Sequence, residues 1–327
     1  MHHLHGLLVG SPLPTQQLAG ERLNKVRALA AFSPDALSSI AYANQEIYLG
    51  LVVAGAAGLV FSWRIGLAIA LLLVIVAFSY LQTIREYPSG GGSYVVAREN
   101  LGVQAGLVAA SALLIDYTLT AAVSLTAGVA SLASAFPALW SYRTGLALGF
   151  LVLITLANLR GLRESGTLMA LPVYFFLFSY LIMLVVGLVR ALGNDPRPFT
   201  ETAPPAVEHV TAFLILHTFA SGCTALTGVE AISNGIPVFR APETRNARQT
   251  LAVMAVLMAI LFVGSIGLTQ YFGITARSDE TILSALARYV FNDTAFYYIV
   301  QVAMLAILVV AANTSFAGFP RLASILA

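Results

Sequence analysis

The amino-acid sequence predicts an all-α polytopic membrane protein. Of its 327 residues, 58% are hydrophobic and only 10% are charged, and the mean hydropathy is +0.84. Soluble domains carry about 25% charged residues, so the missing charge indicates that lipid is the main solvent. The net charge of +2 and the absence of a basic run give no indication of a nucleic-acid partner.

Eight segments are apolar and long enough to cross a bilayer, for which about 20 residues are needed. Lysines and arginines are more frequent in the loops on the side of the N-terminus than in the opposite loops. The positive-inside rule therefore predicts a multi-pass protein of the cell inner or plasma membrane with a cytoplasmic N-terminus. The expected helices are 31–56, 64–86, 102–134, 143–159, 167–190, 211–238, 248–274 and 294–316.

Two of these helices, 31–56 and 211–238, contain polar and glycine-rich stretches at membrane depth and are expected to be broken. Irregular backbone is tolerated there only where it lines a cavity. The two helices are five apart, as a five-plus-five inverted repeat predicts. We therefore expect a cytoplasmic leader (1–27), a first repeat (28–192), an extracellular loop (193–210) and an incomplete second repeat (211–327).

The stretch from Ser33 to Glu46 in the first helix, SPDALSSIAYANQE, is too polar for a simple anchor. A charge at the bilayer centre costs roughly 3 kcal/mol, so Asp35 should face protein, water or an ion. Tyr42 lies two turns further on the same face and brings a hydroxyl that can ligate a cation. The alternatives are an interfacial tyrosine at 42 and a helix-capping aspartate at 35.

In the third helix, Asp116, Thr120 and Ser124 follow one another at intervals of four residues. This spacing places their oxygens on one stripe about 12 Å long. A carboxylate and two hydroxyls on one buried face suit a hard, oxygen-preferring cation. The alternative for the two hydroxyls is an ordinary contact between membrane helices.

The sixth helix contains SGCTALTGVEAISNGIP, from Ser221 to Pro237, in which Thr227 and Glu230 flank Gly228. A carboxyl group removed from water holds its proton more readily, which makes Glu230 a candidate proton carrier. Its alternative role is that of a structural partner for polar groups of the first helix.

Other classes of function have weaker support. An intramembrane enzyme is not expected, because HExxH and GxSxG motifs are absent and His209 and His217 are too sparse for a zinc site. No intrachain disulfide can form, since Cys223 is the only cysteine. A receptor or scaffold is a further alternative, which would bind its ligand without transporting or converting it. No cofactor is expected.

Five stretches resemble KimA-type potassium importers of the K⁺ uptake permease (KUP) family, within the amino acid–polyamine–organocation (APC) superfamily. Together they extend over nearly the whole chain. They are FSPDALSSIAYANQEI, REYPSGGGSYVVARENLG, IDYTLTAAVS, GVEAISNGIPVFRAPETRNARQT and AANTSFAGFPRLASILA.

The resemblance implies an APC/LeuT-like five-plus-five core and K⁺ import by symport with a proton. It also implies twelve helices and a C-terminal cytosolic domain that mediates homodimerisation and, in some members, control by cyclic-di-AMP. An amino acid permease of the superfamily is the alternative; Asp35 beside the helix break would repel a substrate carboxylate, which leaves a cationic amine. The family's potassium path matches Asp35, Tyr42, Asp116, Thr120, Ser124 and Thr227, and its buried glutamate matches Glu230.

Overall fold

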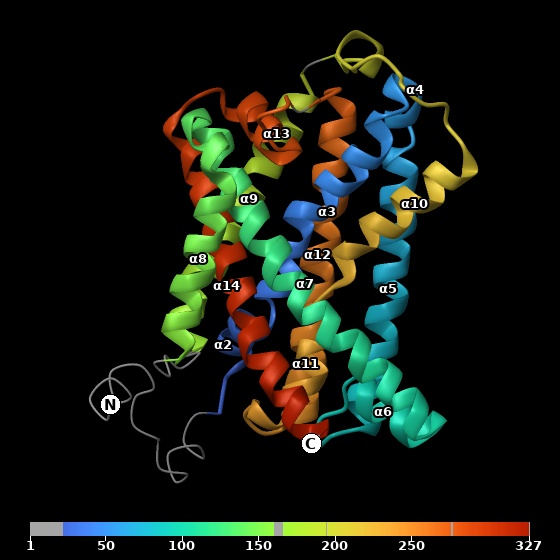
Figure 1. Ribbon diagram of the computed structural model, residues 1–327, viewed down its shortest axis with the longest axis vertical. Helices are drawn as coiled ribbons and strands as arrows, with labels where there is room; N and C mark the ends of the chain where they lie inside the picture. Colours follow the sequence, from blue (N-terminus) through green and yellow to red (C-terminus); the bar gives the residue numbers. More distant parts are fainter. Residues whose placement is uncertain (1–21, 160–165, 194, 276, 327) are drawn as a thin grey trace.

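The computed structural model describes residues 22–159, 166–193, 195–275 and 277–326, so residues 1–21 of the expected leader lie outside the described part. The described residues form a bundle of long helices (Figure 1). The short helices α4 (Gly55–Leu59) and α13 (Ile282–Phe291) lie at one end, which we call the α13 end. Helix α6 (Ser93–Leu101) and the short helix α11 (Ala231–Asn234) lie toward the opposite end, the α6 end.

Seven helical segments of the described residues are long and apolar enough to span a membrane, which makes the chain a multi-pass membrane protein. Their positions agree with seven of the eight expected spans. The segments are Gly55–Glu86, Val103–Ala135, Pro137–Leu159, Met169–Ala191, Ala212–Asn234, Glu243–Tyr271 and Ala295–Ser324.

The expected first span, 31–56, differs from these seven. The chain forms α2 (Lys25–Phe32) and α3 (Pro34–Val52), with Ser33 between them, and α4 follows. Helix α3 is too polar to be counted as a span by composition, but 13 of its 19 residues are buried. It lies inside the bundle, where it packs on α10 (Ala212–Gly222), α12 (Glu243–Tyr271) and α14 (Ala295–Leu326). A helix surrounded by protein needs no apolar outer surface, which explains its polarity.

The expected span 211–238 is also interrupted. Helix α10 ends at Gly222, and a single 3-10 turn, Cys223–Leu226, follows it. Gly228 then adopts a φ of +76°, a conformation that glycine enters without steric cost, before α11 begins. Backbone groups in this turn are satisfied by short-range bonds, such as the one from the Thr227 amide to the Thr224 carbonyl (3.3 Å).

The remaining long helices begin and end within a few residues of the predicted bounds, except that α14 continues about ten residues further. They are α5 (Ser62–Glu86), α7 (Val103–Ala135), α8 (Arg143–Leu159) and α9 (Gly166–Ala191). Helices α6 and α13 were not predicted, because each has only nine or ten residues and no span-length apolar run.

Three consecutive glycines bring the loop before α6 close to α11. The Gly91 amide donates to the Ser233 carbonyl (3.3 Å), and the Ser233 hydroxyl donates to the Gly91 carbonyl (2.5 Å). A Cβ on Gly92 would lie only 2.1 Å from Oδ1 of Asn234. The glycines therefore serve a close backbone contact.

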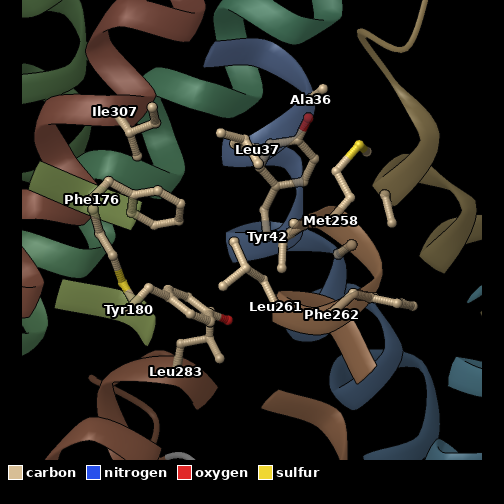
Figure 2. Close-up of a cluster of buried hydrophobic side chains, with 14 of the residues drawn as sticks. Ala36, Leu37, Tyr42, Phe176, Tyr180, Met258, Leu261, Phe262, Leu283 and Ile307 are labelled. Carbon is tan, nitrogen blue, oxygen red and sulfur yellow. The ribbon is translucent and has the colours of Figure 1, made fainter. Parts of the chain in front are cut away.

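The main apolar core joins α3 to the helices around it. Figure 2 shows part of it, in which Tyr42 of α3 lies among side chains from other helices. The buried members drawn there include Leu37, Phe176, Tyr180, Met258, Leu261, Phe262, Leu283 and Ile307. Because this cluster draws on α3, α9, α12, α13 and α14, it fixes the polar central helix in position.

At the α13 end, the guanidinium of Arg288 links α13 to α7 and α14. It donates to Glu280 Oε1 (2.9 Å), to the Ser134 carbonyl (3.0 Å) and to the Tyr297 hydroxyl (2.7 Å). It also pairs with Asp293 and lies over the Tyr297 ring, 4.5 Å from its centroid. The side chain of Glu280 is 8% exposed, so this carboxylate depends on Arg288 for compensation.

The start of α13 is also held by two side chains of other helices. The amide of Ile282 donates to Oε1 of Gln45 on α3 (2.6 Å), and the amide of Thr281 donates to Oγ of Ser134 on α7 (3.0 Å). Helix α13 is therefore attached to both α3 and α7.

We predict that Arg288→Ala lowers the free energy of unfolding by about 3 kcal/mol, because it leaves Glu280 buried without a counter-charge. Thermal unfolding of the purified protein in detergent would measure the loss. Arg277→Ala, which removes an exposed arginine from the same end, is the control and should melt like the wild type. Equal melting temperatures for the two variants would contradict the role of Arg288.

Candidate functional site

The first turn of α3 places a buried carboxylate inside the bundle. Asp35 is 7% exposed, and its Oδ1 has no hydrogen-bond partner among the described residues. The neighbouring hydroxyl of Ser33, at the junction between α2 and α3, is also buried and unpaired within the described part of the chain. Asp35 lies in the first helical turn, where the helix dipole favours negative charge, and the N-cap residue Ser33 makes no side-chain capping bond. It is therefore a carboxylate with free ligand capacity.

The turn between α10 and α11 packs directly against this carboxylate. A Cβ on Gly228 would lie 2.6 Å from the Ala36 amide nitrogen and 2.9 Å from both Cβ and Cγ of Asp35. The Ser39 hydroxyl also reaches the Ala225 carbonyl (3.3 Å). The two interrupted segments, far apart in sequence, therefore meet at Asp35.

Tyr42 and Thr227 connect the same two segments by their hydroxyls, which lie 3.2 Å apart. The Thr227 hydroxyl also donates to the Thr224 carbonyl (3.1 Å). The Tyr42 side chain is 5% exposed. Its oxygen keeps lone pairs that a cation can use.

Helix α7 presents the predicted polar stripe, which has a buried part and a more accessible part. Thr120 is 4% exposed and Ser124 is fully buried, whereas Asp116 is half-buried. No partner of the Ser124 hydroxyl is found among the described residues. Helix α7 packs chiefly on α14 and also contacts α3. Asp116 lies within electrostatic range of Asp35 and Tyr42, whereas Gly128, one turn beyond Ser124 on the same face, packs on Leu305 and Leu308 of α14.

The three acidic residues chosen from the sequence approach one another. The Asp35 carboxyl group lies within electrostatic range of Glu230 and Asp116, and it also interacts with the Thr227 hydroxyl. Glu230 follows Gly228 in the turn before α11, is half-buried and lies near Tyr80 of α5. Within the described ranges, no three acidic, histidine or cysteine side chains converge tightly enough to hold a metal ion. The site therefore contains three separate carboxyl groups and neighbouring hydroxyl groups, rather than a compact cluster of metal ligands.

A cavity of about 1000 Å³ lies between α3, α7, α8 and α14, and Tyr42 forms part of its wall. Several polar residues of this wall were not among the site residues predicted from the sequence, namely Gln45, Glu46 and Ser315. The signal for Glu46 was present, because it lies four residues from Tyr42 and so shares its helical face. Ser315 is buried, and its hydroxyl has no partner among the described residues.

Comparison with known proteins agrees with this architecture. A family model described as amino acid permease matches residues 24–327. The chain belongs to this family. It is also 44% identical over 325 residues to the potassium transporter KimA of Bacillus subtilis (strain 168), an alignment that covers 98% of the chain and 53% of the relative. The chain thus spans about half the length of that relative.

We predict that Gly228→Ala lowers the free energy of unfolding by about 2–3 kcal/mol, since the new methyl group would enter the space of Asp35 and Ala36 at a positive φ. Thermal unfolding in detergent would measure the change.

Gly145→Ala is a matched control, because a Cβ on this residue of α8 meets nothing within 4 Å. It should be neutral or slightly stabilising. A Gly228→Ala variant as stable as this control would mean that the turn does not lie against α3.

Proposed function

We propose that this protein is a secondary transporter that imports K⁺ by symport with a proton. The observation that carries the proposal is the meeting of two interrupted helical segments at Asp35, whose buried oxygen lacks a hydrogen bond among the described residues. Such an oxygen at membrane depth is costly unless an ion or a proton satisfies it. The name of the 44%-identical relative, a potassium transporter, supports K⁺ as the ion.

In this proposal, hydroxyl and carboxylate oxygens replace the hydration shell of the ion near the midplane. Tyr42 and Thr227 contribute from the joined segments, and Asp116, Thr120 and Ser124 contribute from α7. Oxygen ligands of this kind suit a hard monovalent cation. Asp35, at the junction of α2 and α3, holds the ion on its way to the cytoplasmic side.

Glu230 is the proposed proton carrier. It follows the Gly228 turn and lies within electrostatic range of Asp35, so its charge state changes the field at the ion path. A neutral Glu230 lowers the repulsion among the carboxylates, whereas an ionised Glu230 attracts a cation. Alternating protonation thereby couples the movements of the proton and of K⁺.

The proposed setting is the plasma or inner membrane, with the N-terminus and the α6 end in the cytoplasm. The two interrupted segments are then the broken helices 1 and 6 of a five-plus-five inverted-repeat core. We further propose that the protein at its full natural length forms a homodimer through a C-terminal cytosolic domain.

A second candidate is a permease for cationic amino acids or amines, because the family model that matches is described as amino acid permease. Uptake of labelled amines would distinguish it. The acidic character of the site disfavours any substrate that places a free carboxylate beside Asp35.

The K⁺ site is tested by Asp116→Asn in cells that lack their own K⁺ importers and express the protein at its full natural length. The substitution removes one ligand charge, and we expect uptake of radioactive rubidium, a K⁺ tracer, to fall to background. Glu99→Gln on α6, which alters an exposed carboxylate, is the control and should transport normally. Normal uptake by Asp116→Asn would overturn the assignment of this site.

Proton coupling is tested by Glu230→Gln, with uptake measured across external pH and with a protonophore. We expect the variant to retain cation binding but to lose the dependence of uptake on the proton gradient. If Glu230→Gln showed the pH profile and protonophore sensitivity of the wild type, another group would have to carry the proton.

A further inference from the structure

One carboxylate of α3 is not used by the proposed ion site. Glu46 lies one turn beyond Tyr42 toward the α13 end, a rise of about 6 Å along the helix. Tyr42, Gln45, Glu46 and Leu49 all line the cavity between α3, α7, α8 and α14. Glu46 therefore occupies the same compartment as the Tyr42 side chain, but nearer to the α13 end.

Glu46 carries its charge without a protein counter-charge. It is half-buried, and in the described ranges it forms neither an ion pair nor a hydrogen bond through its side chain. Most of the cavity wall is apolar, with residues such as Ala122, Leu125, Leu148 and Leu151. A carboxylate at membrane depth costs roughly 3 kcal/mol unless something compensates it. A mobile cation in the cavity would do so.

The other charged groups around the cavity do not take this role. Glu280 is already engaged by Arg288 (2.9 Å) and by the Ser284 hydroxyl (3.0 Å). Arg143 is exposed and stacks on Trp140, 5.0 Å from the ring centroid, and Arg277 is exposed as well. Water and salt screen exposed charges over about 10 Å, whereas the half-buried Glu46 acts at short range on whatever enters.

We propose that Glu46 forms an outer staging site, at which a monovalent cation binds before it passes to Tyr42. The ligand is the transported ion, K⁺, so the inference rests on the proposed function. A single carboxylate provides loose, partly hydrated binding, because the neighbouring Gln45 amide oxygen already accepts a hydrogen bond from the Ile282 amide (2.6 Å). The ion can therefore leave again toward the deeper oxygens.

If Glu46 forms a staging site, its loss should change the K⁺ concentration that gives half-maximal uptake, but not the maximal rate of uptake. For Glu46→Gln, we expect the external K⁺ concentration at half-maximal rubidium uptake to rise about 3- to 10-fold, because the variant loses the charge that attracts the cation. Maximal uptake, normalised to the amount of protein in the membrane, should stay near the wild-type value. Glu46→Asp should keep most of the wild-type affinity.

Glu208→Gln is the matched control, because Glu208 is an exposed carboxylate at the α13 end that does not line the cavity. It should leave half-saturation unchanged.

Chemical restoration of the charge gives a second test, which does not depend on how well Glu46→Gln folds. Glu46→Cys should transport with low affinity, and a negatively charged thiol reagent should restore the affinity. A neutral reagent of similar size should not. The wild type treated with both reagents controls for reaction at Cys223.

Equal half-saturation for Glu46→Gln and the wild type would overturn the staging site, as would a lower maximal rate at unchanged half-saturation. Failure of charge restoration in Glu46→Cys would also overturn it. Absence of uptake by the wild type is a different result, because it would refute the proposed function itself. Uptake that is present in the wild type and lost in Asp116→Asn supports the proposed function. An unchanged half-saturation for Glu46→Gln then counts against the staging site alone.

Discussion

The close contact between Gly228 and the first turn of α3 is the constraint on which the rest of the site depends. A side chain at this position would enter the space of the Ala36 amide and of Asp35, and the backbone has a positive φ there. Only glycine meets both requirements without strain. This contact brings Thr227 to Tyr42 and places Glu230 within electrostatic range of Asp35.

The arrangement of helices follows from the polarity of α3. This helix carries the polar groups that lipid would not tolerate, and the neighbouring helices α10, α12 and α14 cover much of it. Their outward faces supply the apolar surface, for example Leu216 on α10 and Val256 on α12. On the inner side of α12, apolar side chains such as Leu261 and Phe262 belong to the buried cluster that packs around α3 (Figure 2). The bundle thus keeps the polar groups of α3 away from a surface that is suited to lipid.

Much of this fold could be predicted from the sequence, because lipid imposes a simple rule on composition. The long apolar runs gave bounds such as those of α5 and α8 to within two residues. The same rule does not apply to the central helix α3, since burial by protein relaxes the demand for apolar residues. It also gave no signal for α13, whose ten residues are too few for a span.

The candidate site was only partly readable from the sequence, for a related reason. Helical spacing placed Thr120 and Ser124 on one face, and polarity at membrane depth drew attention to Asp35 and Glu230. Spacing within one helix does not show which helices meet, so the bond between Tyr42 and Thr227 needed the three-dimensional structure. The cavity beside Glu46 needed it too, because four helices form its walls.

The attachment of α13 has a mechanical consequence for this cavity. Gln45 on α3 and Ser134 on α7 accept hydrogen bonds from two consecutive amides, those of Ile282 and Thr281. Both bonds come from the same short segment, so α3 at Gln45 and the end of α7 keep a fixed spacing as long as both bonds persist. The width of the cavity at this end is therefore not an independent degree of freedom. A change in this width would strain or break at least one of the two bonds.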